Sequence, residues 1–297
     1  MVQPMVRDPL SGLAAEPYQA GTCDPDPMTP EQAATQTALP TVPEPFYWTS
    51  ETWGNGLRCR PLQDVASHLF TTRQLQLTGP DDLNRLAASV GAATVAMVTQ
   101  VHAADVVIIR RGEALFEGRP EADVLVSNDP DVAIAVRAAD CVPILLADPV
   151  SGAVGAVHAG WRGTAARAAV VAVETMGRAF GSFPANLLAA IGPSIGSCCY
   201  EVGSELVDAF AAAGHERHLI DRWFMARSTG RALRQRGPLH LDVAGANRDQ
   251  LVLAGVTAHN VYLSGLCTAM NLDVLTSFRA EREKAGRIAG VIVAPRL

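Results

Sequence analysis

Several features that define other classes of protein are missing from this chain of 297 residues. It has no run of about 18 uninterrupted apolar residues, the length that a membrane-spanning helix needs. No block of Lys or Arg interrupts a net charge of −6, so no nucleic-acid partner is expected. The N-terminal residues lack the apolar core of a secretory signal. These absences predict a protein that is neither membrane-spanning nor exported.

Motifs of the common nucleotide-binding folds and of disulfide frameworks are missing too. No G-x-G-x-x-G follows a strand, and there is no Walker A sequence. The six cysteines, at positions 23, 59, 141, 198, 199 and 267, include no C-x-x-C pair of a zinc knuckle or redox loop. Free thiols fit a reducing compartment, so we expect a cytoplasmic protein.

The composition that remains is that of a globular protein, with 48% hydrophobic and 18% charged residues. Residues 1–45 differ, because Pro, Ala, Thr and acidic residues dominate there without a clear period. Prolines such as those in Leu39-Pro-Thr-Val-Pro-Glu-Pro45 are incompatible with a helix interior or a strand ladder. We therefore predict a disordered tail over 1–45 and a single catalytic domain over 46–297.

Short Val- and Ile-rich runs bounded by Gly, Pro or Asp predict strands in this domain. They are Thr94–Val98, Asp105–Arg110, Val132–Arg137, Pro143–Ala147, Ala153–His158, Leu187–Ile191, Asn260–Leu263 and Ile288–Val293. Helices are predicted at Thr164–Phe180, Val202–Ala213 and Asp242–Ala254, each ending close to a glycine. Several strands follow each other directly, and the middle ones are apolar on both faces. The pattern predicts a mixed α/β (α+β) fold with a sheet covered by other layers.

Three polar residues stand within otherwise apolar stretches: His102, Cys141 and His158. Two imidazoles and a thiolate suit zinc, and three protein ligands leave one tetrahedral position open, as in catalytic sites. Taken singly, each has a simpler structural explanation. His102 fits a polar turn, and Cys141 fits a thiol that fills space in the core.

The neighbours of these residues favour chemistry. Asp140 is a carboxylate in an apolar neighbourhood, where an ion is costly unless it is paired or used. Beside a metal it could accept a proton or orient a water molecule. After His158, the segment Ala-Gly-Trp-Arg-Gly leads into a predicted helix, so Arg162 and backbone N–H groups could bind an anion. The alternative is a tight turn in which Trp161 packs against the helix.

Arginines elsewhere are candidates for binding an anionic substrate. Arg73 ends a strand-like run, and Arg279 and Arg287 flank a polar loop. For Arg282 and Lys284, in the same loop, we expect solvated surface charges.

With these residues, the sequence resembles the YfiH-like family, also called the laccase-domain or multicopper polyphenol oxidase family. The resemblance rests on ordered blocks between His68 and about Val293. They are His68-x-Phe-Thr-Thr-Arg73, Thr99-Gln-Val-His102, Ala139-Asp-Cys-Val-Pro143, His158-Ala-Gly-Trp-Arg-Gly163, Ile191-Gly-Pro-Ser-Ile-Gly-x-Cys-Cys-Tyr-Glu-Val-Gly203, Asp242-x-x-x-Ala-Asn-Arg248, Cys267-Thr268, Ser277-Phe-Arg279 and Gly286-Arg287.

The resemblance implies a layered α/β sandwich in which His102, Cys141 and His158 hold one zinc ion. It also implies phosphorolysis of adenosine, inosine and methylthioadenosine, with adenosine deamination at the same site. For deamination, zinc would acidify water for attack on C6 of the base, with Asp140 as the candidate for proton transfer. For phosphorolysis, Arg73, Arg162 and Arg279 are candidates for holding phosphate. The partners are then small molecules, a purine nucleoside and phosphate.

One segment departs from the family pattern. The family usually follows its block at Arg73 with Gly-Gly-Val-Ser, whereas this chain continues Gln-Leu-Gln-Leu-Thr-Gly-Pro, without a double glycine. Because that loop helps to form the mouth of the family's site, the departure bears on substrate preference.

Other functions stay open at this point. Copper could occupy the zinc ligands, because copper(II) outcompetes zinc at most nitrogen and sulfur sites, which would suit polyphenol oxidation. A multicopper centre, however, usually needs close His-x-His pairs, and the seven histidines of this chain form none. Editing of peptidoglycan precursors by a Cys141 nucleophile, without metal, is another alternative. In a non-catalytic protein, Cys199 or Cys267 would close the zinc site as a fourth ligand.

Overall fold

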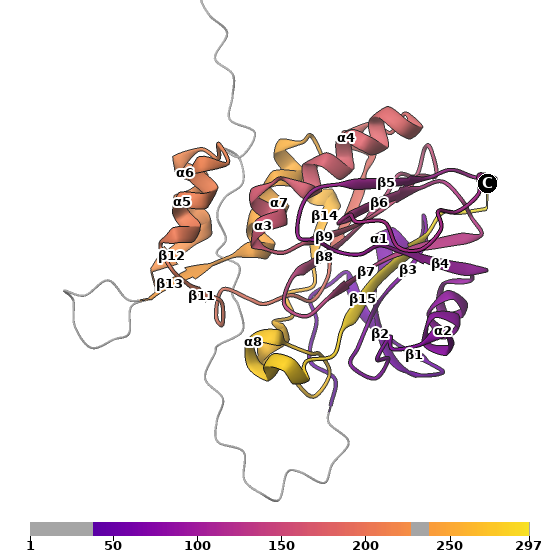
Figure 1. Cartoon of the computed structure of the whole chain (residues 1–297), viewed down its shortest axis with the longest axis horizontal. Coiled ribbons are helices and arrows are strands. Elements are labelled where there is room, and N and C mark those ends of the chain that lie inside the picture. The colour runs from indigo at the N-terminus through magenta and orange to yellow at the C-terminus, as the bar shows by residue number, and fades with distance from the viewer. Residues whose placement is uncertain (1–37, 227–237, 297) are drawn as a thin grey trace, which may run out of the picture.

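Two six-stranded sheets packed face to face form the centre of the molecule (Figure 1). The computed structural model describes residues 38–226 and 238–296. Most strand neighbours are antiparallel, and three pairs are parallel: β4 with β7, β5 with β6, and β10 with β14. The predicted mixed α/β class and its single domain are confirmed.

The first sheet has the order β1-β2-β3-β15-β7-β4. Its strands are β1 (Phe46–Glu51), β2 (Gly54–Cys59), β3 (Ser67–Thr71), β15 (Ile288–Val293), β7 (Val132–Ala138) and β4 (Thr94–Met97). The last strand, β15, lies between β3 and β7 and pairs with both, so strands from the first and last described parts of the chain share one sheet.

The second sheet has the order β14-β10-β8-β9-β6-β5. Its strands are β14 (Val261–Leu263), β10 (Leu188–Ile191), β8 (Val142–Ala147), β9 (Val154–Ala159), β6 (Val124–Ser127) and β5 (Val106–Ile109). Every residue of β6, β8 and β9 is buried. These central strands are therefore covered on both faces, as their unbroken apolar sequence predicts.

The side chains of β8 point alternately into two hydrophobic clusters, one on each face of the sheet. Ile144 and Leu146 belong to the cluster beneath the helices, whereas Leu145 and Ala147 belong to the cluster between the sheets. Successive side chains of a strand point to opposite faces, so a strand buried on both sides must be apolar at every position.

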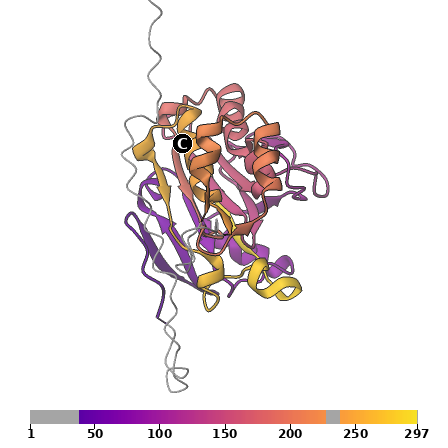
Figure 2. The same ribbon diagram turned by 90° about the vertical axis from the view of Figure 1, so that its left-hand side faces the viewer.

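Helices cover the outer face of each sheet (Figures 1 and 2). The helices α4 (Ala168–Phe180) and α7 (Val243–Leu253) pack on the second sheet, with the short α3 (Trp161–Ala165) beside them. On the first sheet, α2 (Pro80–Val90) packs against β3, β4 and β15. The remaining helices are α1 (Arg60–Gln63), α5 (Glu205–Ala212), α6 (Arg217–Trp223), α8 (Phe278–Glu281) and the 3-10 turns η2 (Pro184–Asn186), η3 (Ala258–Asn260), η4 (Thr268–Met270) and η5 (Arg282–Lys284). A small sheet of β11 (Glu201–Val202), β13 (Leu239–Leu241) and β12 (Phe224–Ala226) lies beside α5 and α6 (Figure 1).

The predicted helix Thr164–Phe180 is wrong in its first turn. The chain forms α3 and α4 instead, separated at Arg167, which has a left-handed φ of 60°. Two carbonyl oxygens, those of Ala213 and Gly214, accept hydrogen bonds from its guanidinium, both at 2.8 Å. These tertiary contacts hold Arg167 in a conformation that breaks the helix.

The predicted tail over 1–45 lies mostly outside the described residues. Within its described end, Leu39 and Val42 pack against the core between the sheets, and the Trp48 indole donates to Pro40 O at 2.8 Å. No helix in the part of the chain that the structure describes is long and apolar enough to cross a bilayer.

Candidate metal centre and cavity

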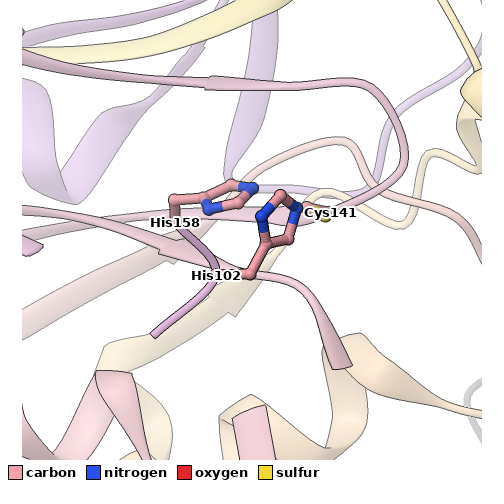
Figure 3. Close-up of side chains that lie close together, drawn as sticks. All are labelled: His102, Cys141 and His158. Atoms are coloured by element: carbon pink, nitrogen blue, oxygen red, sulfur yellow. The ribbon is translucent and has the colours of Figure 1, made fainter. Parts of the chain in front are cut away.

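A loop, a turn and the end of a strand bring His102, Cys141 and His158 together. His102 follows β4, Cys141 lies in the turn between β7 and β8, and His158 is in β9. One ligand atom from each lies within 4.8 Å of the other two. The imidazole rings meet edge to face, with centroids 4.8 Å apart and 80° between their planes (Figure 3).

A buried carboxylate, Asp123, orients this group. Its Oδ1 lies 2.7 Å from Nδ1 of His158, which is consistent with an Nδ1–H donor and leaves Nε2 for a metal. The same carboxylate accepts the backbone N–H groups of His102 at 3.0 Å and Ala103 at 2.7 Å. Asp123 thus fixes one histidine through its ring and the other through its backbone.

The backbone around the triplet leaves little space. His102 and Asp140 both have positive φ, at 63° and 88°, an arrangement that side chains other than glycine rarely adopt. A Cβ on Gly160 would lie 2.7 Å from Sγ of Cys141 and 3.3 Å from Cδ2 of His102. Gly160 is therefore required for the close approach of β9 to the turn that carries Cys141.

The electrostatics of the triplet favour an ionised thiol. Burial raises the pKa of the Cys141 thiol, but hydrogen bonds from His102 and His158 outweigh burial and bring the pKa down to about 7. Burial lowers the pKa of His158, but its bonds to Asp123 and Cys141 prevail and raise the pKa to about 9. The site therefore favours a thiolate, which is the form of cysteine that binds metals.

These residues fit a zinc ion. The donors are two imidazoles and a thiolate of lowered pKa, with a carboxylate on the far nitrogen of one imidazole. Cys199 and Cys267, the two thiols considered as a fourth ligand, do not join this group. They lie together with Cys198 in a separate cluster. Among the described His, Cys, Asp and Glu residues the triplet has no fourth member, so it leaves an open position.

The triplet lies in the wall of a cavity of about 560 Å³. His102 is exposed, so the group is accessible from the cavity, whereas His158 is buried. The cavity lining is rich in arginine and in aromatic residues. Its members of these two kinds are Arg137, Arg279, Arg282, Arg287, Trp161, Tyr200 and Phe278. Such a lining suits a ligand that carries both an anionic group and a flat ring.

Asp140 also lines the cavity, and neighbouring segments use both of its carboxylate oxygens. Thr268 Oγ1 donates to Oδ1, and the backbone N–H of Arg279 donates to Oδ2, both at 2.6 Å. Asp140 thereby fastens η4 and α8 to the turn that carries Cys141. Arg279 itself lines the cavity, with its guanidinium 5.1 Å from the ring centroid of Tyr200.

Two of the predicted phosphate-binding arginines lie elsewhere. Arg73 is not in the cavity lining. It forms a salt bridge with Glu281 at 2.8 Å and donates to the carbonyl oxygen of Leu272. Arg162 is exposed, is also absent from the lining, and stacks on Trp161 with its Cζ 4.3 Å from the ring centroid.

The segment after Arg73, where the sequence departs from the family pattern, is packed rather than open. Leu75 and Leu77 are buried in the cluster beneath α2. No residue of 74–79 is in the cavity lining. The departure therefore lies outside the cavity wall of this structure.

Sequence reasoning missed three features of the site. Asp123 is a carboxylate that directly precedes the buried strand β6, a signal of the same kind as Asp140. Arg137 ends a predicted strand and lies in the cavity wall. The side-chain amide of Gln100 holds its backbone, since it donates to Arg137 O at 2.7 Å and accepts from Arg137 N at 2.8 Å. Arg282 is exposed, as expected of a surface charge, yet it belongs to the lining.

The chain is similar to several known proteins. A family model described as multi-copper polyphenol oxidoreductase laccase matches residues 80–295. A purine nucleoside phosphorylase of Deinococcus radiodurans is 40% identical over 214 residues, covering 71% of this chain and 76% of that protein. The adenosine deaminase RL5 from an unknown prokaryote is 41% identical over 175 residues, which are 59% of this chain and 62% of its own length.

Solved structures show the same fold. The chain matches YfiH of Bacillus licheniformis with a TM-score of 0.71 and 26% identity, over 85% of this chain and all (100%) of that one. YlmD of Geobacillus stearothermophilus matches with a TM-score of 0.69 and 28% identity, over 85% and 100% of the two chains.

Proposed function

Because the chain belongs to the YfiH family of laccase-like domains, we propose that it is a zinc-dependent purine nucleoside enzyme. Its reactions would be phosphorolysis of adenosine, inosine and methylthioadenosine, and deamination of adenosine. The relatives named purine nucleoside phosphorylase and adenosine deaminase support both activities. Zinc at His102, Cys141 and His158 is part of the proposal.

The main support for this proposal is that the candidate metal ligands and four arginines line the same cavity. The arginines are Arg137, Arg279, Arg282 and Arg287. The pairing of β7 with β15 brings Arg137 and Arg287 close to each other. Arg137 lies opposite Ala289, and Arg287 is only two residues before Ala289 in the sequence. Burial lowers the pKa of Arg137, and the positive charges of Arg119 and then Arg287 lower it further. A site that gathers like charges is stabilised by an anion such as phosphate.

In phosphorolysis, a phosphate oxygen forms a bond to C1′ of the ribose as the bond from C1′ to the base nitrogen breaks. The base leaves with the electron pair and takes up a proton. Arg137, Arg279 and Arg287 would hold phosphate, since positioning and charge provide most of the catalysis in such transfers. The faces of Trp161 and Tyr200 would hold the purine ring.

In deamination, water adds to C6 of adenosine and the exocyclic nitrogen leaves as ammonia. Zinc, when bound, supplies a positive charge that makes water more acidic and polarises the substrate. Asp140 is our candidate for moving the proton from water to the leaving nitrogen, because it lies next to Cys141 in the cavity wall. Its two hydrogen bonds keep the carboxylate in one orientation.

Product analysis tests the proposal. Zinc-loaded protein is incubated with adenosine and phosphate, and adenine, ribose 1-phosphate, ammonia and inosine are quantified, together with the hypoxanthine that phosphorolysis of inosine would form. We expect both product pairs, and neither from His158→Ala. Release of no more base and ammonia than His158→Ala gives would contradict the proposal.

The arginines have a matched test. Arg287→Met should raise the KM for phosphate by about tenfold, the effect of losing one charged hydrogen bond. Arg85→Met, which removes an arginine from the exposed side of α2, should leave it unchanged. Equal KM values for the two variants would argue against a phosphate site at Arg287.

A Cys141 nucleophile is the second candidate, and the lowered pKa of this thiol favours it. Such a hydrolase would suit removal of an amino acid from a peptidoglycan precursor. Activity that survives chelation but not alkylation would identify it, whereas zinc catalysis is lost on chelation.

The oxidase alternative places copper at the same three ligands. Metal analysis of protein purified without added copper, together with a phenol-oxidation assay, tests it.

A further inference from the structure

A second group of soft ligands lies outside the triplet. Cys198 and Cys199 are in the turn that follows β10, and Cys267 directly precedes η4. The three sulfur atoms lie within 4.8 Å of one another, and those of Cys198 and Cys199 are 3.6 Å apart. The two segments are about 70 residues apart in sequence, so tertiary structure alone brings the thiols together.

The backbone holds this cluster firmly. Ser194 and Cys267 form an isolated parallel bridge, and the N–H of Gly196 donates to Sγ of Cys267 at 3.3 Å. A Cβ on Gly196 would lie 3.2 Å from Sγ of Cys198 and 3.3 Å from Cβ of Cys267. His240 adds a bond between its Nδ1 and Ser197 O at 2.7 Å. The thiols are thus preorganised, with glycine at the point of closest approach.

We propose that Cys198, Cys199 and Cys267 form a second metal site, which binds monovalent copper through three sulfur atoms. Three metal–sulfur bonds of about 2.3 Å at about 120° to one another place neighbouring sulfurs about 4.0 Å apart. The sulfurs of Cys198 and Cys199, at 3.6 Å, are within a few tenths of an ångström of that spacing. A shift of a few tenths of an ångström would complete the site.

The donor set selects the metal. Thiolates are soft ligands that prefer copper(I) and zinc to harder ions. Zinc usually takes four ligands, whereas this cluster has three members and no fourth His, Cys or carboxylate among the described residues. Copper(I), which accepts three ligands, fits better. The thiol protons leave to solvent when the metal binds.

The site has its own entrance. Cys198 and Cys267 line a cavity of about 470 Å³ that shares no lining residue with the cavity of the triplet. The turn between β10 and β11 separates the two. Ile195 and Tyr200 line the first cavity, whereas Ser194 and Gly196 line the second. The proposed copper site is therefore behind the wall that carries Tyr200, and it is independent of the proposed nucleoside chemistry.

Copper competition tests the proposal in the full chain. Every variant carries Cys23→Ser, because this thiol lies outside the described residues, and Cys141→Ser, which removes the first site. Copper(I) is titrated anaerobically against bathocuproine disulfonate. We expect one equivalent of copper retained by this background, and none after Cys198→Ser or Cys267→Ser is added.

Cys59→Ala is the matched control. This thiol is also buried, but it belongs to neither cluster, so its removal should leave one equivalent of copper bound. Thermal melting checks that each variant folds, and X-ray absorption of the copper-loaded background should show sulfur ligands only. Retention of less than one equivalent by the background, equal retention after Cys198→Ser, or nitrogen or oxygen among the ligands would overturn the proposal.

Discussion

Gly160 determines how closely β9 approaches the turn that carries Cys141. Gly160→Ala would place a methyl group against the sulfur, because the Cβ would lie 2.7 Å from it. We expect zinc affinity to fall at least tenfold, as Cys141 moves from its place between the histidines, with zinc measured by competition against a chromophoric chelator. Gly79→Ala is the control, since no atom lies within 4 Å of that Cβ. Equal affinities would show that the thiol accommodates the methyl group.

Asp123 holds two residues of the proposed metal site, His158 through its ring and His102 through its backbone. Burial raises the pKa of its carboxyl, but bonds from His158 and the two amides outweigh burial and keep the pKa below its usual range. Asp123→Asn keeps the shape but removes the charge that orients the imidazole. Zinc affinity should fall by about 10- to 100-fold, as for other carboxylates that support a metal-bound histidine.

Asp148 offers a matched control for this change. It is an equally buried carboxylate that accepts hydrogen bonds within its own turn, from Val150 N at 2.9 Å and Ser151 Oγ at 2.7 Å. Asp148→Asn should lower the melting temperature without changing zinc affinity. If both variants lost zinc equally, loss of stability rather than ligand orientation would explain the effect of Asp123→Asn.

At the scale of elements, α8 depends on a salt bridge rather than on its own length. The four residues of α8 are too few to be stable alone, and Glu281 accepts bonds from Arg73, from Thr276 Oγ1 and from the N–H of Ser277. The salt bridge thereby fixes α8, whose Arg279 lines the cavity. The geometry favours a positioning role for Arg73.

Two variants separate positioning from direct phosphate contact. If Arg73 only positions α8, Glu281→Gln and Arg73→Met should raise the KM for phosphate by similar factors. If Arg73 touches phosphate, Arg73→Met alone should have the larger effect. Initial rates at varied phosphate, with kcat and KM fitted separately, make the comparison.

The sequence predicted the elements whose own residues determine them. Ile288–Val293 coincides with β15, and Asp242 caps α7 by accepting a hydrogen bond from Gly245 N at 2.9 Å. The split between α3 and α4 was missed, because contacts of Arg167 with the distant 213–214 turn cause it. The helix α2 was not predicted, although Pro80 with acidic residues in the first turn and Gly91 after the last is a recognisable pattern.

The same distinction applies to the site. Residue type and family blocks indicated His102, Cys141 and His158 as partners, and the structure brings them together. The sequence could have indicated Asp123 as a carboxylate beside a buried strand, but its partner His158 follows only from the pairing of β6 with β9, which places Val124 opposite Val157. Arg137 and Arg287 meet through the pairing of β7 with β15, across about 150 residues of sequence. Strand order is a property of the whole fold, which local patterns do not encode.

At the scale of the whole molecule, a buried histidine links stability to pH. His68 lies in β3, where its Nε2 accepts the N–H of Cys59 at 2.9 Å and its Nδ1 lies 3.3 Å from Ala66 O. Burial lowers its pKa from 6.5 to about 4. Between pH 6.5 and about pH 4, His68 binds a proton in the unfolded chain but not in the folded one. The free energy of unfolding therefore decreases as the pH falls through this range.

We expect His68 to contribute about 2.5 kcal/mol to the loss of unfolding free energy between pH 7 and pH 4.5. His68→Gln keeps an acceptor for the amide of Cys59 but does not titrate, so its stability should depend less on pH over this range. Urea unfolding at both pH values measures the difference. If the wild-type protein and His68→Gln lost the same unfolding free energy between the two pH values, groups other than His68 would cause the acid sensitivity.

The left-handed backbone at His102 has an evolutionary consequence. A side chain in this conformation costs about 1 kcal/mol relative to glycine, and here the amide bonds to Asp123 maintain it. Glycine at 102 would relieve that strain but remove an imidazole of the site. A descendant that did not need the proposed metal would therefore gain from drifting to glycine, so a retained histidine at this position would mark lineages in which the proposed chemistry is under selection.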